Sequence, residues 1–348
     1  MRTTFTELLS IDHPIMQAPI GMASGPELAA SVCQAGGLGS IAVWPIPVDA
    51  VAERVKAVRE RTARPFSVNI RADLNQHEHV AIALAAGAPC MHLFWGDAKP
   101  YAAAVHDAGA KLLCTVSSTD DAKQAIDAGA DILIAQGWEA GGHVRGTMTT
   151  LTLVPAVIDL APQIPVLAAG GIVDGRGLAA MLMLGAAGVA MGSRFVACKE
   201  SRAHEVYKQA IVQGQACNTQ HLTNLFDGGW PSAPHRVLSN STVRDWQAAG
   251  SPDPGLRPKE SETVAQRPDG SHIHRYSMSS PLAGMTGNLE SLALYAGQGI
   301  DGICDVAAAK TIINSVMQQA EASLSNVARL VGGNQPVNHD PGRQAEQR

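Results

Sequence analysis

Several features that would assign this chain of 348 residues to other protein classes are rare or absent in it. Aromatic residues make up only 4% of the sequence, which is little for a β-sandwich with an aromatic core. Lys and Arg number 26 against 31 Asp and Glu, and a net charge of −5 without a basic run argues against nucleic-acid binding. No apolar stretch reaches about 18 uninterrupted residues, and no signal-peptide pattern is present. We therefore expect a cytoplasmic protein without membrane contact.

Motifs for metals, disulfides and several common enzyme classes are also missing. The six cysteines are widely spaced without a C-x-x-C pair, so we expect neither a disulfide framework nor a zinc site. The pairs His77/His79 and His272/His274 lie in polar stretches without a Cys or carboxylate cluster, so no metal is expected. The absence of G-x-G-x-x-G, Walker and G-x-S-x-G motifs argues against a Rossmann site, a P-loop and an α/β-hydrolase.

The sequence does contain a regular alternation of short β-rich runs and longer Ala-rich segments over its first 200 residues. Small Ala-Gly turns recur between a helix-length segment and the next apolar run. Alternation of this kind predicts parallel βαβ units and an α/β fold, specifically a (β/α)₈ TIM barrel, with a doubly wound open sheet as the alternative. The eight expected strands cover residues 15–18, 38–43, 66–70, 91–94, 112–116, 132–135, 166–169 and 189–191.

The composition changes after about residue 200. We expect residues 1–200 to form the barrel, completed by residues 291–331. Residues 201–290, rich in polar residues and proline, are expected to form a smaller, mostly helical or irregular domain on the substrate side of the barrel mouth. The polar tail, residues 332–348, is expected to be disordered. Two helices are expected near the C-terminus, over residues 288–296 and 306–330.

Two glycine-containing turns follow the seventh and eighth expected strands. In a barrel, the loops after these two strands commonly form a phosphate site. Gly170 and Gly171 precede a helix, so their backbone N–H groups can point towards an anion. Gly192 and Ser193 add two further N–H groups and a hydroxyl. The pair of turns predicts a phosphorylated cofactor or substrate, although tight turns of small residues are the simpler reading of each alone.

The loop after the sixth expected strand, residues 135–146, combines four glycines with three ionisable side chains. His143 is the main candidate for proton transfer, because histidine changes charge near neutral pH. A structural histidine that only stabilises the loop is the alternative. Glu139 and Arg145 are expected either to orient His143 or to form a surface ion pair with each other.

Five motifs, in this order along the chain, resemble the nitronate monooxygenase family, formerly called 2-nitropropane dioxygenases. The resemblance covers about residues 5–200 and 281–330 and implies a barrel with non-covalently bound FMN. Residues 94–96 and the segment 227–281 depart from the family pattern, so the resemblance does not identify the substrate. The motifs lie at residues 14–21, 135–146, 168–172, 191–193 and 295–299.

The resemblance also implies roles for individual residues. His143 matches the catalytic histidine of the family, and Gln298 is expected to approach the flavin. The FMN phosphate is expected at Gly170, Gly171, Gly192 and Ser193. The flavin ring and ribityl chain are expected to be lined by Ala18, Met22, Asn69 and Gln136, with close backbone approach at Gly141 and Gly142.

The activity implied by the resemblance is FMN-dependent oxidation of alkyl nitronates or nitroalkanes with O₂, through a flavin semiquinone, to a carbonyl compound and nitrite. His143 would remove the α-proton or bind the nitro group. The alternative is an FMN-dependent NAD(P)H reductase acting on a quinone or an enoyl thioester, because enoyl-thioester reductases carry a similar segment around this histidine and residues 148–155 also resemble them. A flavin-binding protein without activity is a third reading. The expected partners are a small molecule and O₂, and a homodimer is compatible with the sequence.

Overall fold

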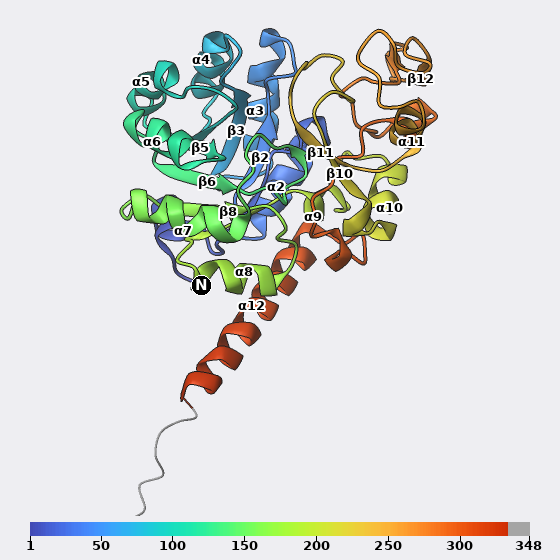
Figure 1. Cartoon of the computed structure of the whole chain (residues 1–348). Helices are drawn as coiled ribbons and strands as arrows, with labels where there is room; N and C mark the ends of the chain where they lie inside the picture. The colour runs from blue at the N-terminus through green and yellow to red at the C-terminus, as the bar shows by residue number, and fades with distance from the viewer. Residues whose placement is uncertain (333–348) are drawn as a thin grey trace, which may run out of the picture.

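The computed structural model describes residues 1–332 of the chain. The tail expected to be disordered, residues 332–348, lies outside this range except for its first residue. The chain forms a barrel that carries a second lobe on one side, and a long C-terminal helix runs beneath both (Figure 1).

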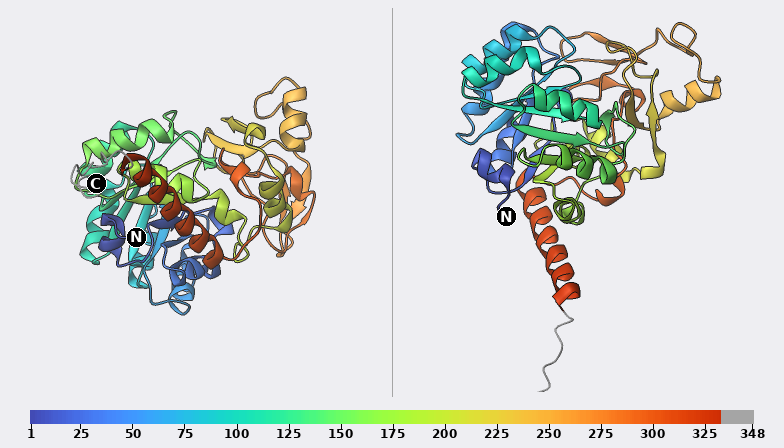
Figure 2. Two further views of the ribbon diagram at one scale, coloured as in Figure 1. Left: turned by 90° about the horizontal axis from the view of Figure 1, so that it is seen from below. Right: turned by 60° about the vertical axis from the view of Figure 1, so that its left-hand side comes forward.

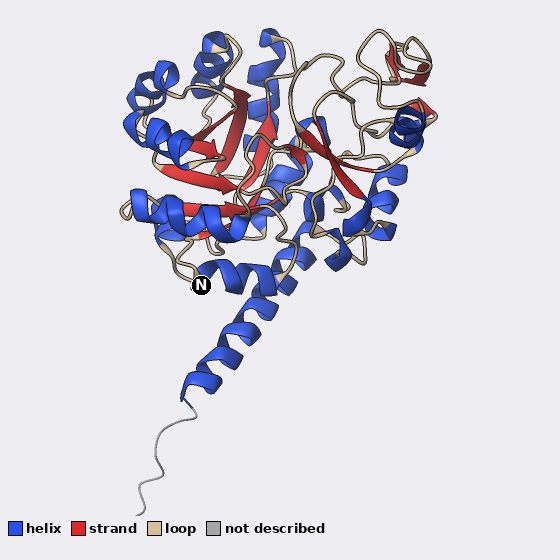
Figure 3. Cartoon of the chain, viewed as in Figure 1, coloured by secondary structure: helices blue, strands red, loops and turns tan. Residues whose placement is uncertain are grey.

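Eight parallel strands form the barrel, and each overlaps one of the eight expected from the sequence. Helices surround these strands on the outside (Figure 3). In spatial order the strands are β1 (Ile15–Gln17), β9 (Gly188–Met191), β8 (Val166–Ala169), β6 (Ile132–Gln136), β5 (Lys111–Val116), β4 (Cys90–Phe94), β3 (Phe66–Arg71) and β2 (Gly39–Ala42).

The two edge strands of this sheet, β1 and β2, meet and close it. Met16 and Leu38 form a parallel bridge. The Gln17 N–H donates to Leu38 O at 2.9 Å, and the Leu38 N–H donates to Ile15 O at 2.9 Å. The prediction of a (β/α)₈ barrel is therefore confirmed, and the open-sheet alternative is excluded.

The outer helices begin and end where local chemistry favours it. Ser118 Oγ accepts the Asp121 N–H at 3.1 Å and caps the sixth helix, and Asp174 caps the eighth. Gly109 has a φ of +72° just after the fifth helix, which is the conformation that favours glycine at this position. The helices are α1 (Thr4–Leu9), α2 (Pro26–Gln34), α3 (Val51–Arg59), α4 (His77–Ala85), α5 (Lys99–Asp107), α6 (Thr119–Asp127), α7 (Thr150–Leu160) and α8 (Gly175–Met183), with 3₁₀ turns η1 (Gly21–Ala23) and η2 (Val48–Ala50).

The segment after β9, expected to be mostly helical or irregular, contains short helices and long irregular stretches, and it also contributes strands to two three-stranded sheets. One sheet has the order β10-β11-β7, in which β7 (Gly142–His143) comes from the loop after β6, and the other has the order β13-β12-β14. The elements are α9 (Ser193–Val196), α10 (Glu205–Gln213), η3 (Ala216–Asn218), β10 (Thr219–Leu222), β11 (His235–Leu238), α11 (Ser241–Ala248), β12 (Thr263–Gln266), β13 (His272–His274), β14 (Thr286–Gly287), η4 (Leu289–Ser291) and η5 (Ile300–Gly302). We call residues 201–308 the second lobe.

The helix expected over residues 288–296 was a wrong prediction. Only η4 is helical there, and the apolar residues after it run alongside β11. The Leu238 N–H donates to Leu294 O at 2.8 Å, and Val237 forms an antiparallel bridge with Tyr295. The apolar run is therefore buried as an extended segment in the second lobe.

The final helix, α12 (Ala309–Gly332), confirms the helix expected over residues 306–330. It crosses beneath the barrel, and its last turns project beyond it (Figure 2). Gly175 allows the close approach of α12 to α8, since a Cβ there would lie 2.2 Å from Val316 O. Within residues 1–332, no helix combines the length and the apolar character needed to cross a membrane.

Candidate active site

A cavity of about 580 Å³ opens at the carboxyl ends of the barrel strands. This volume lies within the range typical of small-molecule and cofactor sites. One wall is formed by the loops that follow the strands, and we call it the barrel wall. The opposite wall, which we call the lobe wall, is formed by second-lobe residues that include Trp230, Arg267 and Tyr295.

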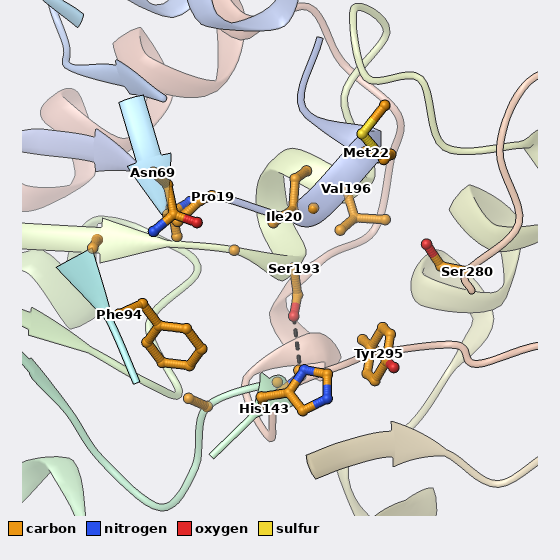
Figure 4. A pocket seen from close by; sticks show the side chains of 18 of the residues that line it. Pro19, Ile20, Met22, Asn69, Phe94, His143, Ser193, Val196, Ser280 and Tyr295 are labelled. Atoms are coloured by element: carbon orange, nitrogen blue, oxygen red, sulfur yellow. Dashed lines mark hydrogen bonds between the residues drawn. The ribbon is translucent and has the colours of Figure 1, made fainter. Parts of the chain in front are cut away.

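Most of the site residues expected from the sequence lie around this one cavity. Gln298 is the exception, because its side chain is exposed while its neighbours Gly297 and Gly299 line the cavity. Several of these side chains appear together in Figure 4. The expected residues that line the cavity are Ala18, Met22, Asn69, Gln136, Gly141, Gly142, His143, Gly170, Gly171, Gly192 and Ser193.

The barrel wall presents backbone rather than side chains at the ends of β8 and β9. Gly170 has a φ of +112° and Gly171 a φ of +72°, so this turn requires glycine. Within residues 1–332, the N–H groups of Gly171 and Ser193 have no hydrogen-bond acceptor. Ser193 Oγ accepts the Gly297 N–H at 3.0 Å, which leaves its own hydrogen free to donate. The wall therefore offers donors for an anion.

Two amides line the barrel wall deeper in the cavity. The Gln136 Nε2 donates to His143 O at 3.2 Å, whereas its Oε1 is buried and has no partner in the described residues. Asn69 Nδ2 donates to His92 O at 3.0 Å. A buried acceptor without a donor is costly, so the free Gln136 oxygen indicates that a ligand completes its hydrogen bonding.

The loop that carries His143 belongs to both parts of the molecule. It leaves the barrel at the end of β6, and its short strand β7 (Gly142–His143) pairs antiparallel with β11 of the second lobe. His143 lies opposite His235 in this pairing. The second lobe therefore fixes the position of the main catalytic candidate.

Glu139 and Arg145 neither pair with each other nor orient His143, so both expectations for these two residues were wrong. Glu139 Oε2 accepts the Thr150 N–H at 2.8 Å and the Thr150 hydroxyl at 2.9 Å. Arg145 pairs with Asp121 at 2.6 Å. Both side chains hold the loop to the barrel, and neither contacts His143.

Two glycines of this loop have different functions. A Cβ on Gly141 would lie 2.4 Å from the Gly297 nitrogen, so this glycine permits the C-terminal segment to approach. Gly142 has a φ of +75°, and a Cβ there would meet no atom within 4 Å. Both glycines line the cavity, but the Cβ side of Gly141 is filled by the C-terminal segment, whereas that of Gly142 is open.

The His143 side chain is partly buried, and its imidazole lies among other rings. Its ring centroid lies 3.9 Å from that of Trp230 at an interplanar angle of 25°, and 5.5 Å and 5.7 Å from those of Tyr295 and His235. Its Nε2 is buried and has no hydrogen-bond partner in the described residues. Burial lowers the pKa of His143 well below its ordinary value, and electrostatic coupling to the neighbouring His235 and to the Arg71 guanidinium lowers it further. The side chain is therefore a neutral imidazole with a free acceptor nitrogen.

Sequence reasoning missed most of the aromatic residues around this histidine. Phe94 and Trp95 lie in the segment that departs from the family pattern, and Trp95 adopts a left-handed φ of +62°. Trp230 lies in the other departing segment. The neighbours of Trp230 could not be inferred from local sequence, because Trp44 and Phe94 contact it from distant parts of the chain. The one local sign of a role for Trp230 is that a large aromatic residue stands within a polar stretch of sequence.

The barrel wall fits FMN on its own geometry. Free N–H groups at Gly171 and Ser193 suit the phosphate, and the free Gln136 oxygen suits a donor of the flavin ring or ribityl chain. No group of three or more His, Cys, Asp or Glu side chains over residues 1–332 is arranged to hold a metal ion. The site therefore suits an organic phosphate-bearing cofactor.

The family model described as nitronate monooxygenase matches residues 2–87 and 79–319. The chain belongs to this family. Its fold, its glycine turns and its buried histidine agree with the resemblance seen in the sequence. The chain is accordingly a flavin-dependent oxidoreductase.

Curated relatives carry two kinds of name. A protein of Mycobacterium tuberculosis named (3aS,4S,5R,7aS)-5-hydroxy-7a-methyl-1-oxo-octahydro-1H-indene-4-carboxyl-CoA dehydrogenase is 37% identical over 246 residues, which cover 70% of this chain and 68% of that protein. A probable nitronate monooxygenase of Staphylococcus aureus is 31% identical over 274 residues, which cover 65% of this chain and 76% of that protein.

Solved structures show the same division. FabK of Thermotoga maritima superposes with a TM-score of 0.81 at 33% identity, covering 95% of this chain and 99% of its own. A nitroalkane oxidase of Streptomyces ansochromogenes superposes with a TM-score of 0.73 at 27% identity, covering 93% of this chain and all of its own. The same fold is thus found both in FabK and in a protein named as a nitroalkane oxidase.

Proposed function

We propose that this chain is an FMN-dependent enzyme that oxidises alkyl nitronates or nitroalkanes with O₂ to a carbonyl compound and nitrite. The observation that carries the proposal is the buried, neutral His143 with a free Nε2 in the wall of the cavity. A nitroalkane has an acidic α-hydrogen, and a neutral imidazole is the form that can accept it. The family match and the nitroalkane oxidase structure support this substrate class.

FMN would be held by the barrel wall. Gly170, Gly171, Gly192 and Ser193 would bind its phosphate, and Gln136 and Asn69 would contact the flavin ring or ribityl chain. The residues Ala18, Met22 and Gly142 would lie against it. When bound, FMN supplies the electron transfer that protein side chains cannot perform.

The protein's own contribution is proton transfer and exclusion of water. His143 Nε2 would take the α-proton of a neutral nitroalkane, and the rings of Trp230 and Tyr295 would exclude water from it. The Tyr295 hydroxyl donates to Met278 O at 2.9 Å, so it is already engaged. If the substrate arrives as the nitronate anion, no proton needs to be removed and His143 would instead bind the nitro group.

The variant His143→Asn tests this role. With a neutral nitroalkane we expect kcat to fall by about 10²–10⁴-fold, the usual contribution of a positioned base. With the preformed nitronate we expect a much smaller loss. His272→Asn, an exposed histidine on β13, is the control for folding and flavin content. Unchanged turnover of both substrates by His143→Asn would contradict the proposal.

A second function is favoured by two arginines. Arg202 and Arg267 line the cavity from the second lobe, and within residues 1–332 neither pairs with a carboxylate. Such cations suit the phosphates of a CoA thioester or of NAD(P)H. The relative named as a carboxyl-CoA dehydrogenase supports the thioester, and the alternative is therefore an FMN-dependent reductase or dehydrogenase.

An anaerobic flavin spectrum separates the two functions. NADH, NADPH and ethyl nitronate would be added to separate samples of the purified holoenzyme. Bleaching by the nitronate alone is the result expected from the first function. Bleaching by a nicotinamide alone would favour the second.

A further inference from the structure

Trp230 lies between two charged or ionisable side chains. It belongs to the loop between β10 and β11 and is 5% exposed. The His143 ring is stacked on it, with 3.9 Å between centroids, and the guanidinium carbon of Arg71 lies 3.3 Å from the same indole centroid. The imidazole and the guanidinium would clash if both lay on the same face of the indole, because each is so close to the ring centre. Arg71 and His143 therefore cover opposite faces of the indole.

Arg71 is itself fixed at the end of β3. Its Nε and Nη2 donate to the two carboxylate oxygens of Asp73, at 3.0 Å and 2.6 Å. Its guanidinium also lies 5.3 Å from the Trp44 ring. A guanidinium over an aromatic face is attracted by the ring quadrupole, so Arg71 holds the indole from the barrel side.

The turn that carries Trp230 is anchored in the second lobe. The backbone N–H of Trp230 donates to the Asp227 carbonyl oxygen at 2.9 Å. The Asp227 carboxylate accepts two hydrogen bonds from Arg257, at 2.8 Å and 2.7 Å, and the Arg257 side chain is 2% exposed. A buried bidentate ion pair fixes position strongly, so this loop is held as a rigid support.

We propose that Trp230 is a positioning residue for His143. Pressed between the fixed Arg71 and the imidazole, it holds the ring of His143 in one orientation and keeps water from it. This inference rests on the proposed function of His143 as the base, and it gives the departing segment 227–281 a defined role in the reaction.

The surroundings of His143 decide what loss of Trp230 would do. His235, Tyr295 and Trp95 also face the imidazole, with ring centroids 5.5–6.1 Å away. Because burial is the largest cause of the low His143 pKa, entry of water in place of the indole would raise it. The charge of Arg71 opposes that rise without being the main cause.

Three variants of the holoenzyme test the proposal. Trp230→Leu removes the stacking surface, Trp230→Phe keeps an aromatic face, and Trp246→Phe is a matched change of a buried tryptophan on α11 of the same lobe. For Trp230→Leu we expect kcat with a neutral nitroalkane to fall by about 10–100-fold, with KM changed by less than about 3-fold, because misplacement of a catalytic group acts on the chemical step. Trp230→Phe should stay within about 3-fold of the unchanged enzyme.

The second readout does not depend on turnover. The His143 ring would be titrated by NMR in the holoenzyme and assigned by its loss in His143→Asn. We expect its pKa to rise in Trp230→Leu and to move little in Trp230→Phe and Trp246→Phe. Suppose the His143 pKa rises in Trp230→Leu while His143→Asn keeps full activity. This result would support the positioning of the His143 ring by Trp230, and it would contradict only the proposed function of His143 as the base.

Two results would overturn the proposal. One is an unchanged His143 titration and kcat in Trp230→Leu. The other is a change in KM alone, which would make Trp230 a wall for substrate. If Trp230→Leu does not fold, Arg71→Met replaces it, since it removes the support behind the indole. In that variant kcat is the deciding measurement, because loss of the Arg71 charge by itself raises the His143 pKa. An unchanged kcat would overturn the proposal equally.

Discussion

The two walls of the cavity use different parts of the polypeptide. The barrel wall presents backbone N–H groups, held in place by glycines such as Gly170 and Gly171. The lobe wall presents large side chains, of which Trp230, Arg267 and Tyr295 are examples. Backbone donors suit a ligand group common to many enzymes, such as a phosphate. Side chains can change with the substrate while the barrel stays the same, so the lobe wall is where substrate choice is expected to reside.

The sharpest way to test the barrel wall is to replace Gly171. Gly171→Val puts a β-branched residue at a φ of +72° and beside the free N–H groups, so we expect flavin affinity to fall by about 100-fold. The flavin-to-protein ratio after gel filtration measures it.

Gly109→Val is the matched control, because Gly109 has the same φ of +72° and lies outside the cavity. It should carry the same backbone strain and retain flavin. Equal flavin loss in both variants would show that strain, and not the barrel wall, explains the result.

The histidines at the two walls predict how stability depends on pH. Burial lowers the pKa of His92, in the barrel, to about 3, and it also lowers the pKa of His143 and of His235. Each of them is neutral in the folded protein and takes up a proton more readily when unfolded. Stability should therefore fall as the pH falls below about 6.5, by at most about 1.4 kcal/mol per pH unit for each histidine.

Urea unfolding between pH 7.5 and 5 measures this loss, and His92→Gln should reduce it. A free energy of unfolding that stays constant over this range would contradict the assignment of neutral histidines. A slope that His92→Gln leaves unchanged would instead assign the effect to the other histidines whose pKa is lowered.

The smallest expected effect concerns the lobe wall. Arg267→Met should raise KM for a CoA thioester or NAD(P)H by about 5-fold, the scale of a partly exposed ion pair, and leave KM for a nitroalkane unchanged. Flavin content should not change. Arg244→Met, an exposed arginine of α11, serves as the control. An equal change of KM for both substrate classes would remove Arg267 as a determinant of substrate choice.

The barrel was predictable because its signals are local. Each strand is a short apolar run, and residues such as Ser118 and Gly109 mark helix ends by their own chemistry. The glycine turns at Gly170 and Gly192 were found for the same reason. The role proposed for these turns follows from their place at consecutive strand ends, which the order of the chain reveals.

The lobe wall was not predictable, because its contacts join distant segments. Trp230 meets Arg71 from β3 and His143 from β7, and no local pattern indicates that pairing. The sequence predicts a helix over residues 288–296, but hydrogen bonds to β11 hold the apolar residues 292–296 extended. Glu139 and Arg145 are close in sequence, yet each finds its partner elsewhere.

The placement of the tryptophans has an optical consequence. Of the five in the chain, Trp44 and Trp230 line the cavity, and Trp95 and Trp138 lie within two loops at its edge. Indole emits light at wavelengths where flavins absorb, so a bound flavin would quench these four by energy transfer. Trp246, within α11, is the tryptophan that neither lines the cavity nor contacts those that do. The intrinsic fluorescence of the protein would thus report the loading of its own active site.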